Sequence, residues 1–461
     1  MGCTGSRIQE EPDLNSVWDR YERGEVLGKG GYGEVLVVQR KKDKTEFAMK
    51  LMKKTSNDPT IEATFNTEST IMKELDHKNV IKFEASYEDD ENYYLVSELC
   101  AGGELFDHIV ENHHFSEKIA ASILRDALLG LKHCHQNNIV HLDLKPENLV
   151  LKSEDPDSDI VIIDFGCARK LEAGKTYNDR VGTPYYVSPE MLDSKLQKTG
   201  DILKACDMWS LGVIAYVMVT GRPPFGGTDN SRIYARIKRG EYKYPSSLKL
   251  SADLKDLIAK LLTKNPVARL TVDEALQHPW VQGKDASTAP LDSSVRDALR
   301  HFQNHNKLKK AIAHMLVKNM TKKDELELKK KFQELDKDNS GTLETTEVVK
   351  FLKGFGYNED QAVKNAPEFI KDVDVDHDGV ISENEFRTVA VRGQLSTNES
   401  KIRETFQQLD ANHDGYLTVS EISEFLKMHP GDEIKDMFKE VDANNDGKIT
   451  YDEFMKAMVN S

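Results

Sequence analysis

The chain has 461 residues, of which 38% are hydrophobic and 31% are charged, and its formal net charge is −15. At roughly 100–200 residues per domain the length predicts two to four domains, and the composition excludes a collagen-like, disulfide-stapled or mainly disordered chain. The longest nearly apolar run, 208–219, is too short for the ~20 residues of a membrane-spanning helix. The cysteines are scattered without metal-ligand spacing and no secretory stretch follows Met1, so we expect a cytoplasmic protein without a transmembrane helix.

The first half of the chain changes character at about residue 100. Its earlier part holds short β-rich runs interrupted by one helical stretch, and the later part is mostly helical up to about residue 280. The β-rich runs lie at 25–27, 34–39, 47–51 and 93–98, and the helical stretch at 64–75. These patterns predict a small sheet-rich lobe followed by a larger helical lobe.

Gly28, Gly30 and Gly33 form a G-x-G-x-x-G pattern, which alone is weak evidence for a nucleotide site. A dinucleotide-binding fingerprint requires the third glycine to open a helix, whereas residues 34–38 have the composition of a strand. A hairpin that folds over phosphates is therefore favoured, and it resembles the glycine-rich lid of protein kinases. The residues of this lid that we expect to bind ATP are Leu27, Gly28, Lys29, Gly30, Gly31, Tyr32, Gly33 and Val35.

Further residues of the predicted ATP site follow from the same resemblance. Lys50, in the run Phe-Ala-Met-Lys, resembles the phosphate-pairing lysine of kinases, and Glu68 heads an amphipathic stretch. We predict an ion pair between them. Alignment by motif places Ser97 at the gatekeeper position beside the adenine, and the ATP site is expected to include Glu98, Cys100 and Glu104.

The catalytic signature is the strongest motif of the chain. Residues 141–148 (His-Leu-Asp-Leu-Lys-Pro-Glu-Asn) and 164–166 (Asp-Phe-Gly) have the order and spacing of a kinase catalytic loop and magnesium loop. The resemblance implies that Asp143 accepts the proton of the substrate hydroxyl and that Lys145 neutralises the γ-phosphate. It assigns Mg²⁺ to Asn148 and Asp164.

Two qualifications accompany this assignment. A pseudokinase would have the same fold, but Lys50, Asp143, Asn148 and Asp164 are all present, which disfavours it. Leu142 stands where kinases usually have arginine, and a leucine cannot pair with a phosphate on the activation segment. We therefore expect activation to depend on something other than that phosphorylation. Residues 143–148 together with the motif around Thr183, at 182–186, resemble a serine/threonine kinase of the calmodulin-kinase group and not a tyrosine kinase.

The last third contains four twelve-residue repeats at 336–347, 374–385, 410–421 and 442–453. Each has oxygen-bearing side chains at positions one, three, five and nine, glycine at six and glutamate at twelve, as a seven-oxygen calcium loop needs. Position seven contributes its backbone carbonyl. The predicted calcium ligands are Asp336, Asp338, Ser340, Thr342, Glu344 and Glu347; Asp374, Asp376, Asp378, Val380, Ser382 and Glu385; Asp410, Asn412, Asp414, Tyr416, Thr418 and Glu421; and Asp442, Asn444, Asp446, Lys448, Thr450 and Glu453. The alternative is a degenerate loop that keeps its fold without its ion, but every loop retains its first and last carboxylates. Position eight, held by Leu343, Ile381, Leu417 and Ile449, predicts pairing of loop one with two and of three with four.

A basic segment precedes the acidic repeats. Residues 295–323 contain eight Lys and Arg against one acid, whereas residues 325–461 contain 17 Lys and Arg against 30 Asp and Glu. The apolar residues of 295–320 recur at helical spacing, which predicts a calmodulin-target-like helix or a membrane-surface helix. An intramolecular partner is favoured because the same chain supplies an acidic domain, and an ordinary packed helix is the alternative.

The N-terminus fits a lipidation pattern. Met1-Gly2-Cys3-Thr4-Gly5-Ser6 matches M-G-x-x-x-[ST], which predicts myristoylation of Gly2 and allows palmitoylation of Cys3. Two acyl chains anchor a protein stably, whereas one binds membranes only marginally. An unmodified tail is the alternative.

Apart from roughly its first 20 residues, the whole chain resembles the calcium-dependent protein kinases of plants and protists. The resemblance implies an α+β, two-lobed kinase fold followed by an all-α, calmodulin-like domain with four EF-hands. We expect a tail at 1–20, a kinase domain at 21–280, an autoinhibitory junction at 281–324 and the EF-hand domain at 325–461. The implied activity is transfer of the ATP γ-phosphate to protein Ser or Thr with Mg²⁺, after Ca²⁺ relieves inhibition by the junction.

The expected partners follow from these assignments. They are protein substrates with an arginine upstream of the acceptor, which Glu104 would recognise, and a cytosol-facing membrane bound through the acylated tail. The EF-hands are expected to engage the junction within one monomer, and no nucleic-acid partner is expected. A non-enzymatic, calcium-responsive membrane scaffold is the competing interpretation.

Overall fold

The computed structural model describes a large part of the chain, in two compact units. The described residues are 17–300 and 302, except 31–32, 55–58, 112–114, 156–157, 178–181, 194, 228–229 and 285, and then 330, 332–336, 342–343, 345–354, 362, 366, 381–382, 403, 406–407, 409–426, 438, 441–442, 444 and 446–454. The first unit comprises the described residues up to His108 together with 122–142 and 146–172. The second comprises 109–121, 143–145 and the described residues from 173 onward.

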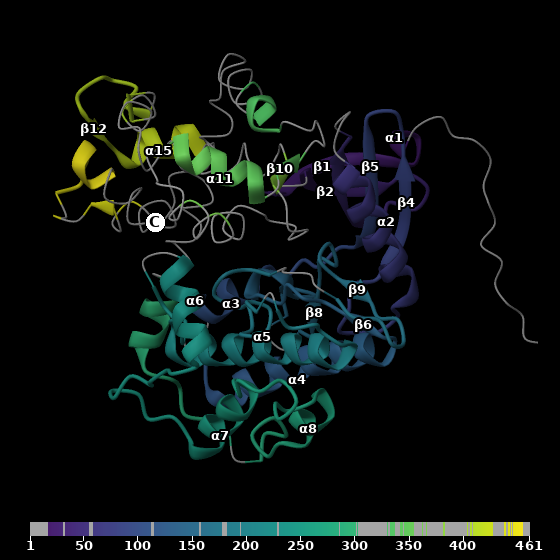
Figure 1. Cartoon of the computed structure of the whole chain (residues 1–461), viewed down its shortest axis with the longest axis vertical. Coiled ribbons are helices and arrows are strands. Elements are labelled where there is room, and N and C mark those ends of the chain that lie inside the picture. Colours follow the sequence, from purple (N-terminus) through teal and green to yellow (C-terminus); the bar gives the residue numbers. More distant parts are fainter. Residues whose placement is uncertain are drawn as a thin grey trace, which may run out of the picture. The chain divides into compact units, whose positions relative to one another are not determined.

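A five-stranded antiparallel sheet forms the sheet-rich part of the first unit (Figure 1). Its spatial order is β1-β2-β3-β5-β4, and helix α2 (Pro59–Glu74) belongs to the same unit. The strands are β1 (Tyr21–Gly30), β2 (Gly33–Arg40), β3 (Glu46–Lys53), β4 (Phe83–Glu88) and β5 (Asn92–Glu98). The sequence pattern did not indicate β4, an edge strand whose side chains are half-buried or exposed on both faces, so no apolar alternation marks it.

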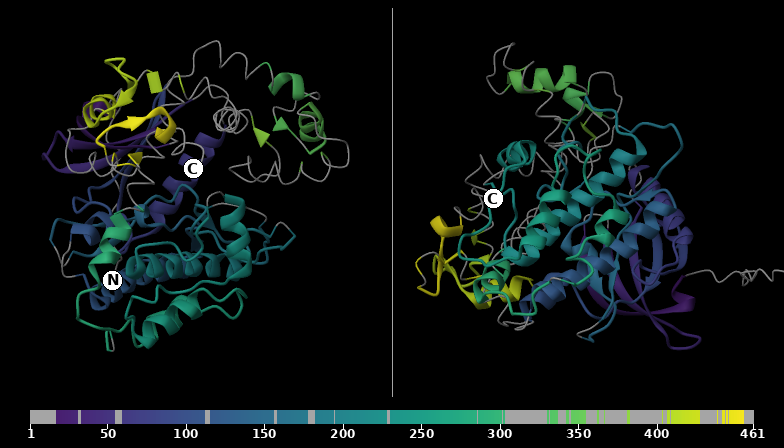
Figure 2. Two further views of the ribbon diagram at one scale, coloured as in Figure 1. Left: turned by 90° about the vertical axis from the view of Figure 1, so that its left-hand side faces the viewer. Right: turned by 90° about the horizontal axis from the view of Figure 1, so that it is seen from below.

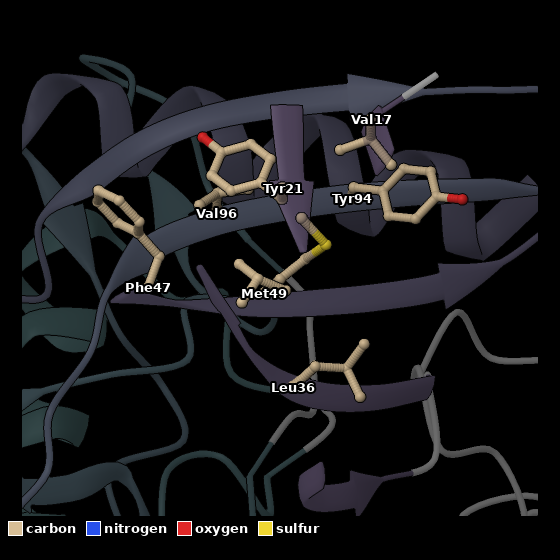
Figure 3. Packing of buried hydrophobic residues seen from close by; sticks show 8 residues of the cluster. Val17, Tyr21, Leu36, Phe47, Met49, Tyr94 and Val96 are labelled. Atoms are coloured by element: carbon tan, nitrogen blue, oxygen red, sulfur yellow. The ribbon is translucent and has the colours of Figure 1, made fainter. Parts of the chain in front are cut away.

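One face of this sheet is closed by the residues that precede it. Helix α1 (Val17–Arg20) brings Val17 onto the sheet, where Val17 and Tyr21 pack with Leu36, Val38, Phe47, Met49, Tyr94 and Val96, as Figure 3 shows. The turn after β2 holds α1 in place, because the Lys41 backbone N–H donates to the Arg20 carbonyl at 2.9 Å. Folded structure therefore begins before the first strand.

The remainder of the first unit holds one long helix, a second helix and several short elements. These are α3 (Leu105–Glu111) and α4 (Glu117–Gln136), both of which pass from one unit to the other, β6 (Ile139–Val140), η1 (Pro146–Asn148), β7 (Leu149–Leu151), β8 (Ile160–Ile162) and β9 (Arg169–Lys170). Strand β6 pairs with β9, and β7 pairs with β8. In the sequence, the catalytic-loop residues lie between β6 and β7, and each of these strands is held in a two-stranded ladder.

The second unit is built around α5 (Gly200–Thr220), the long teal helix in Figure 2. Among the described residues α5 is the one helix long and apolar enough to cross a membrane, but 89% of its apolar window is buried inside the protein, which identifies it as a core helix. Gly212 allows α7 (Ala252–Leu261) to approach closely, since a Cβ there would lie 2.8 Å from the Cβ of Leu261. Helices α6 (Asn230–Arg239) and α8 (Val272–Gln277) complete this part.

The described elements of the last third of the chain are short helices and two-stranded ladders. The helices are α11 (Thr345–Gly354) and α15 (Val419–Leu426), and the strands are β10 (Thr342–Leu343), β11 (Ile381–Ser382), β12 (Tyr416–Leu417) and β13 (Ile449–Thr450). Leu343 pairs with Ile381 and Leu417 pairs with Ile449. The predicted pairing of loop one with two and of three with four is confirmed.

Candidate active site and calcium loops

A charge cluster in the first unit joins strand β3, helix α2 and the loop after β8. The Lys50 ammonium on β3 lies 2.8 Å from Oε2 and 3.0 Å from Oε1 of Glu68 on α2, and 2.8 Å from Oδ1 of Asp164. Glu68 is 2% exposed. Burial opposes the charge of Lys50, but Glu68 and Asp164 outweigh it and hold the pKa of Lys50 above its usual range. The predicted Lys50–Glu68 ion pair is present, and it extends to a predicted magnesium ligand.

The backbone at Asp164 is in the left-handed region, with φ of 62°. Aspartate tolerates this region better than most residues. The following Phe165 is fully buried and packs against the His141 ring, with centroids 5.0 Å apart, and Nε2 of His141 lies 3.0 Å from the Ile163 carbonyl. These contacts fix the direction in which the Asp164 carboxylate leaves the chain.

Leu142 and Asn148 are catalytic-loop residues that belong to the same unit. Leu142 is buried and has φ of 66°, a strained conformation for a leucine. Its apolar side chain lies where an arginine was expected by resemblance, and it offers no group to a phosphate. Asn148, on η1, is buried, and its backbone carbonyl accepts an N–H from Ile163 at 3.0 Å.

The second unit holds a compact polar triangle. Oδ2 of Asp143 lies 2.5 Å from the Lys145 ammonium, and Oδ1 accepts the Thr183 hydroxyl at 2.8 Å. The Lys145 ammonium also lies 3.4 Å from the Thr183 hydroxyl. Both predicted catalytic residues of this unit are therefore in contact. Thr183 was not among the predicted site residues, although the motif that contains it was noted as a mark of the kinase class.

The glycine-rich segment forms the β1–β2 hairpin. Gly28 faces Val35 and Gly30 faces Gly33 across the ladder, so the third glycine opens a strand and not a helix. Gly33 has φ of 147°, and a Cβ there would lie 1.8 Å from the Leu51 carbonyl oxygen, so no other residue fits. Leu27 is half exposed. Gly31 and Tyr32 lie outside the described residues.

The remaining residues predicted for the ATP site lie at and after the end of β5. Ser97 occupies the strand end, and Glu98 accepts the Lys82 N–H at 3.0 Å and pairs with Lys152 at 3.0 Å. Burial raises the pKa of the half-buried Cys100 thiol to about 12, so this thiol is protonated at neutral pH. The backbone of Glu104 forms an isolated antiparallel β-bridge with Val150 of β7.

Calcium loop three, residues 410–421, is described in full. Asp410 accepts the N–H of Asp414 at 3.1 Å through Oδ1 and that of Gly415 at 2.9 Å through Oδ2, and Gly415 has φ of 84°. Oε2 of Glu421 accepts both the N–H and the hydroxyl of Thr418, at 2.8 and 2.7 Å. Loop four repeats these bonds with Asp442, Asp446, Gly447, Thr450 and Glu453.

The donor set of these two loops fits calcium. Carboxylate, amide and hydroxyl oxygens and one backbone carbonyl are the ligands that Ca²⁺ prefers. No three His, Cys, Asp or Glu side chains within the described ranges converge as a metal cluster.

Loops one and two are described only in part. Loop one has Asp336 and Glu347, both buried, and Thr342, while Ser382 represents loop two. The predicted residues Asp338, Ser340, Glu344, Asp374, Asp376, Asp378, Val380 and Glu385, and the lipidation residues Gly2 and Cys3, lie outside the described residues.

Comparison with known proteins gives two family matches and a set of relatives. The protein kinase domain model matches residues 21–281, and the EF-hand domain pair model matches 325–391 and 399–459. Calcium-dependent protein kinase 9 of Arabidopsis thaliana is 36% identical over 413 residues, covering 88% of this chain and 75% of the relative. Calcium-dependent protein kinase 5 of Plasmodium falciparum is 35% identical over 427 residues, covering 91% of this chain and 72% of the relative.

Proposed function

The chain belongs to the calcium-dependent protein kinases, and from this premise we propose how its residues divide the work of a Ca²⁺-activated Ser/Thr protein kinase. The observation that carries the proposal is the Lys50–Glu68–Asp164 cluster, which gathers a phosphate-pairing cation and a magnesium carboxylate in one unit. A scaffold without activity has no need for a half-buried lysine held between two acids.

Phosphoryl transfer requires charge neutralisation on ATP and an acceptor hydroxyl placed in line with the γ-phosphate. In this proposal Lys50 binds the α- and β-phosphates, and Glu68 keeps the lysine in position. Asp164 and Asn148 would hold Mg²⁺, which when bound neutralises the phosphate oxygens. Asp143 orients the hydroxyl of the substrate and accepts its proton, while Lys145 neutralises the γ-phosphate.

Thr183 adds a positioning role to this proposal. Its hydroxyl donates to one oxygen of Asp143, and Lys145 holds the other. The carboxylate is therefore fixed by two bonds, and its orientation does not depend on the substrate. A fixed carboxylate lowers the reorganisation needed when the hydroxyl arrives.

The calcium loops supply the regulatory input in this proposal. The oxygens of loops three and four would hold Ca²⁺, and bound Ca²⁺ supplies the charge that draws the loop carboxylates together. Asp410 and Glu421, with their counterparts Asp442 and Glu453, would supply the first and last carboxylates of each loop to the ion, beside the N–H bonds that they accept within the loop. In sensor EF-hands, calcium binding opens the helix pair and exposes an apolar groove.

The start of the junction supports autoinhibition. Residues 293–300 are helical, and Val295 and Leu299 are 1% and 0% exposed in the second unit. Phe302 then places its ring edge-on to Tyr185, with centroids 5.6 Å apart. Tyr185 lies two residues after Thr183, which contacts Asp143. The junction thereby reaches the segment that borders the acceptor site, and we propose that it blocks protein substrates there until Ca²⁺ binds.

The segment before this helix is held as well. The Lys118 N–H donates to the Ser287 carbonyl at 3.0 Å, and the Leu291 N–H donates to the Phe115 carbonyl at 2.8 Å. The predicted linker is therefore tied to the beginning of α4, and release of the junction can begin beyond residue 291.

The decisive experiment is phosphorylation of a peptide by the full chain with ATP and Mg²⁺, in calcium and in chelator. We expect calcium-dependent activity that Asp143→Asn removes. Activity that is absent under both conditions, with Ca²⁺ still bound, would favour the scaffold. Peptides with Arg or Ala three residues before the acceptor test the proposed role of Glu104, and equal turnover of the two would refute it.

We also propose that acylation of Gly2 and Cys3 attaches the kinase to a cytosol-facing membrane. The motif at the N-terminus supports this proposal. Both acyl chains are needed for stable attachment, because one acyl chain binds membranes only marginally and two anchor stably. Mass spectrometry of the N-terminal peptide from eukaryotic cells tests it directly. Gly2→Ala should move the kinase to the soluble fraction, and an unmodified Gly2 in the wild type would contradict the proposal.

A further inference from the structure

Two histidine rings are stacked where the loop after α2 meets α4. His77, in the loop, and His133, on α4, have ring centroids 5.2 Å apart and planes inclined by 20°. Both side chains belong to the first unit and both are half-buried. Neither is used by the catalytic proposal above.

Each ring accepts a hydrogen bond from the backbone of this loop. The Asn79 N–H donates to Nδ1 of His77 at 3.1 Å, and the Asp76 N–H donates to Nε2 of His133 at 3.3 Å. A backbone N–H can only donate, so each of these two ring nitrogens acts as the acceptor and carries no proton while its hydrogen bond is made. A protonated imidazole has no acceptor nitrogen. Protonation of either ring therefore breaks one of these bonds, and protonation of both places two positive charges face to face.

The loop that the pair holds is the continuation of α2. Helix α2 ends at Glu74, and Asp76 follows it by two residues. The far end of the loop has further bonds that do not involve imidazoles, because the Asn79 side-chain amide donates to the Ile160 carbonyl at 2.8 Å and the Asn79 backbone carbonyl accepts the Ile162 N–H. The hydrogen bond from Asp76 to the His133 ring therefore ties the residues just after the end of α2 to helix α4. Glu68 lies on the same helix, six residues before that end.

We infer that the stacked, neutral pair of His77 and His133 positions α2, and through it the Glu68 carboxylate on Lys50, so that protonation of the pair lowers kinase activity. This inference rests on the proposed role of the Lys50–Glu68 ion pair in binding ATP. His77 and His133 are positioning residues, since neither touches the reacting groups.

The surrounding charges favour this direction. Burial, His133 and Lys78 lower the pKa of His77, and Asp76 opposes them. Other acids of this region have partners of their own: Asp159 pairs with Lys78 at 2.6 Å, Glu74 pairs with Lys170 of β9, and Asp126 accepts the Ile160 N–H. An unfolded histidine binds its proton at about pH 6.5, and a lowered folded pKa means that the folded loop resists protonation. The stability that the neutral ring contributes is therefore complete above about pH 6.5 and declines as the pH falls below it.

The test compares the full-length, calcium-saturated wild type with the double variant His77→Asn, His133→Gln. The Asn Oδ1 and Gln Oε1 atoms can accept the same two N–H bonds, but they do not titrate. We expect kcat/KM of the variant within about threefold of wild type at about pH 7.5, and at about pH 5.8 we expect it to retain roughly five times more of its own neutral-pH activity than wild type retains. An equal acid decline in both proteins would overturn the inference.

The matched control is His278→Gln. His278 lies in the second unit, with Nε2 2.9 Å from an oxygen of Asp256. Its replacement removes one histidine without touching the loop, so this variant should keep the acid decline of the wild type. Loss of the decline in the control would show that it is not specific to the stacked pair.

Amide hydrogen exchange gives a readout that does not depend on catalysis. After correction for intrinsic rates, the Asp76 and Asn79 amides of the wild type should lose protection between about pH 7.5 and 5.8, and those of the double variant should not. Unchanged protection in the wild type would refute the inference even if the double variant failed to fold. A wild type without kinase activity at neutral pH would count against the proposed function, and exchange would then test the pair alone.

Discussion

Replacing Gly221 by alanine should weaken the docking of the junction helix and raise activity without calcium. Gly221 ends α5 with φ of 72°, and its N–H donates to the Val217 carbonyl. A Cβ there would lie 2.4 Å from the Val295 carbonyl oxygen and 2.6 Å from the Cβ of Ala298. Residues 293–300 must therefore shift, or the contact must break. The predicted change acts on the docked helix and not on the ATP site.

The magnitude follows from two separate costs. The left-handed φ costs an alanine about 1–2 kcal/mol, but this strain is present whether the junction is docked or released, so it cancels in the regulatory equilibrium. The overlap with residues 295 and 298 exists only in the docked state and costs about 2 kcal/mol. A cost of about 2 kcal/mol is roughly a thirtyfold shift, so a kinase that is about 1% active in chelator would become roughly one quarter active.

Gly240→Ala is the matched control. Gly240 follows α6 with the same φ of 72° and its N–H donates to the Arg236 carbonyl, but the nearest atoms to an added Cβ belong to the flexible Lys264 side chain. The assay is peptide phosphorylation in chelator and in calcium, with a melting curve for each protein. Chelator activities of the two variants that agree within about twofold, at similar stability, would refute the inhibitory role of this contact.

Three further predictions follow from the site and the loops. Lys50→Met and Asp143→Ala should each abolish phosphotransfer and leave calcium binding unchanged by calorimetry, because the two kinds of site are separate in the chain; retention of about a tenth of activity by Asp143→Ala would remove its catalytic assignment. Glu453→Gln should raise the calcium concentration for half-maximal activity, since position twelve supplies two ligand oxygens, and an unchanged midpoint would argue against this loop as a regulator. Ser97→Met should weaken an ATP-competitive purine analogue with a bulky aromatic group, because it fills the space behind the adenine that the small serine leaves open. ATP turnover should change little, and half-maximal inhibitor concentrations within about threefold, at matched ATP saturation, would contradict the gatekeeper assignment.

The calcium loops and the kinase motifs were predictable from sequence because their information is local. All ligands of one calcium loop lie within twelve residues, and position eight alone predicted the Leu417–Ile449 pairing that the ladder shows. The glycine pattern likewise predicted a hairpin, because the residues after Gly33 have strand composition. Spacing along a strand, helix or turn is a property of the backbone, and a single sequence contains it.

Tertiary structure decided which distant residues meet. Lys50 reaches Asp164 across 114 positions, and Thr183 reaches Asp143 across 40. No local period relates such positions, so one sequence gives the residue types without the pairing. Edge strand β4 escaped prediction for a related reason, since its half-buried faces lack an apolar alternation. The hydrogen bond of His133 is likewise a consequence of folding: its ring accepts a backbone N–H from Asp76, 57 positions earlier in the chain, and only the packed loop brings that donor within reach.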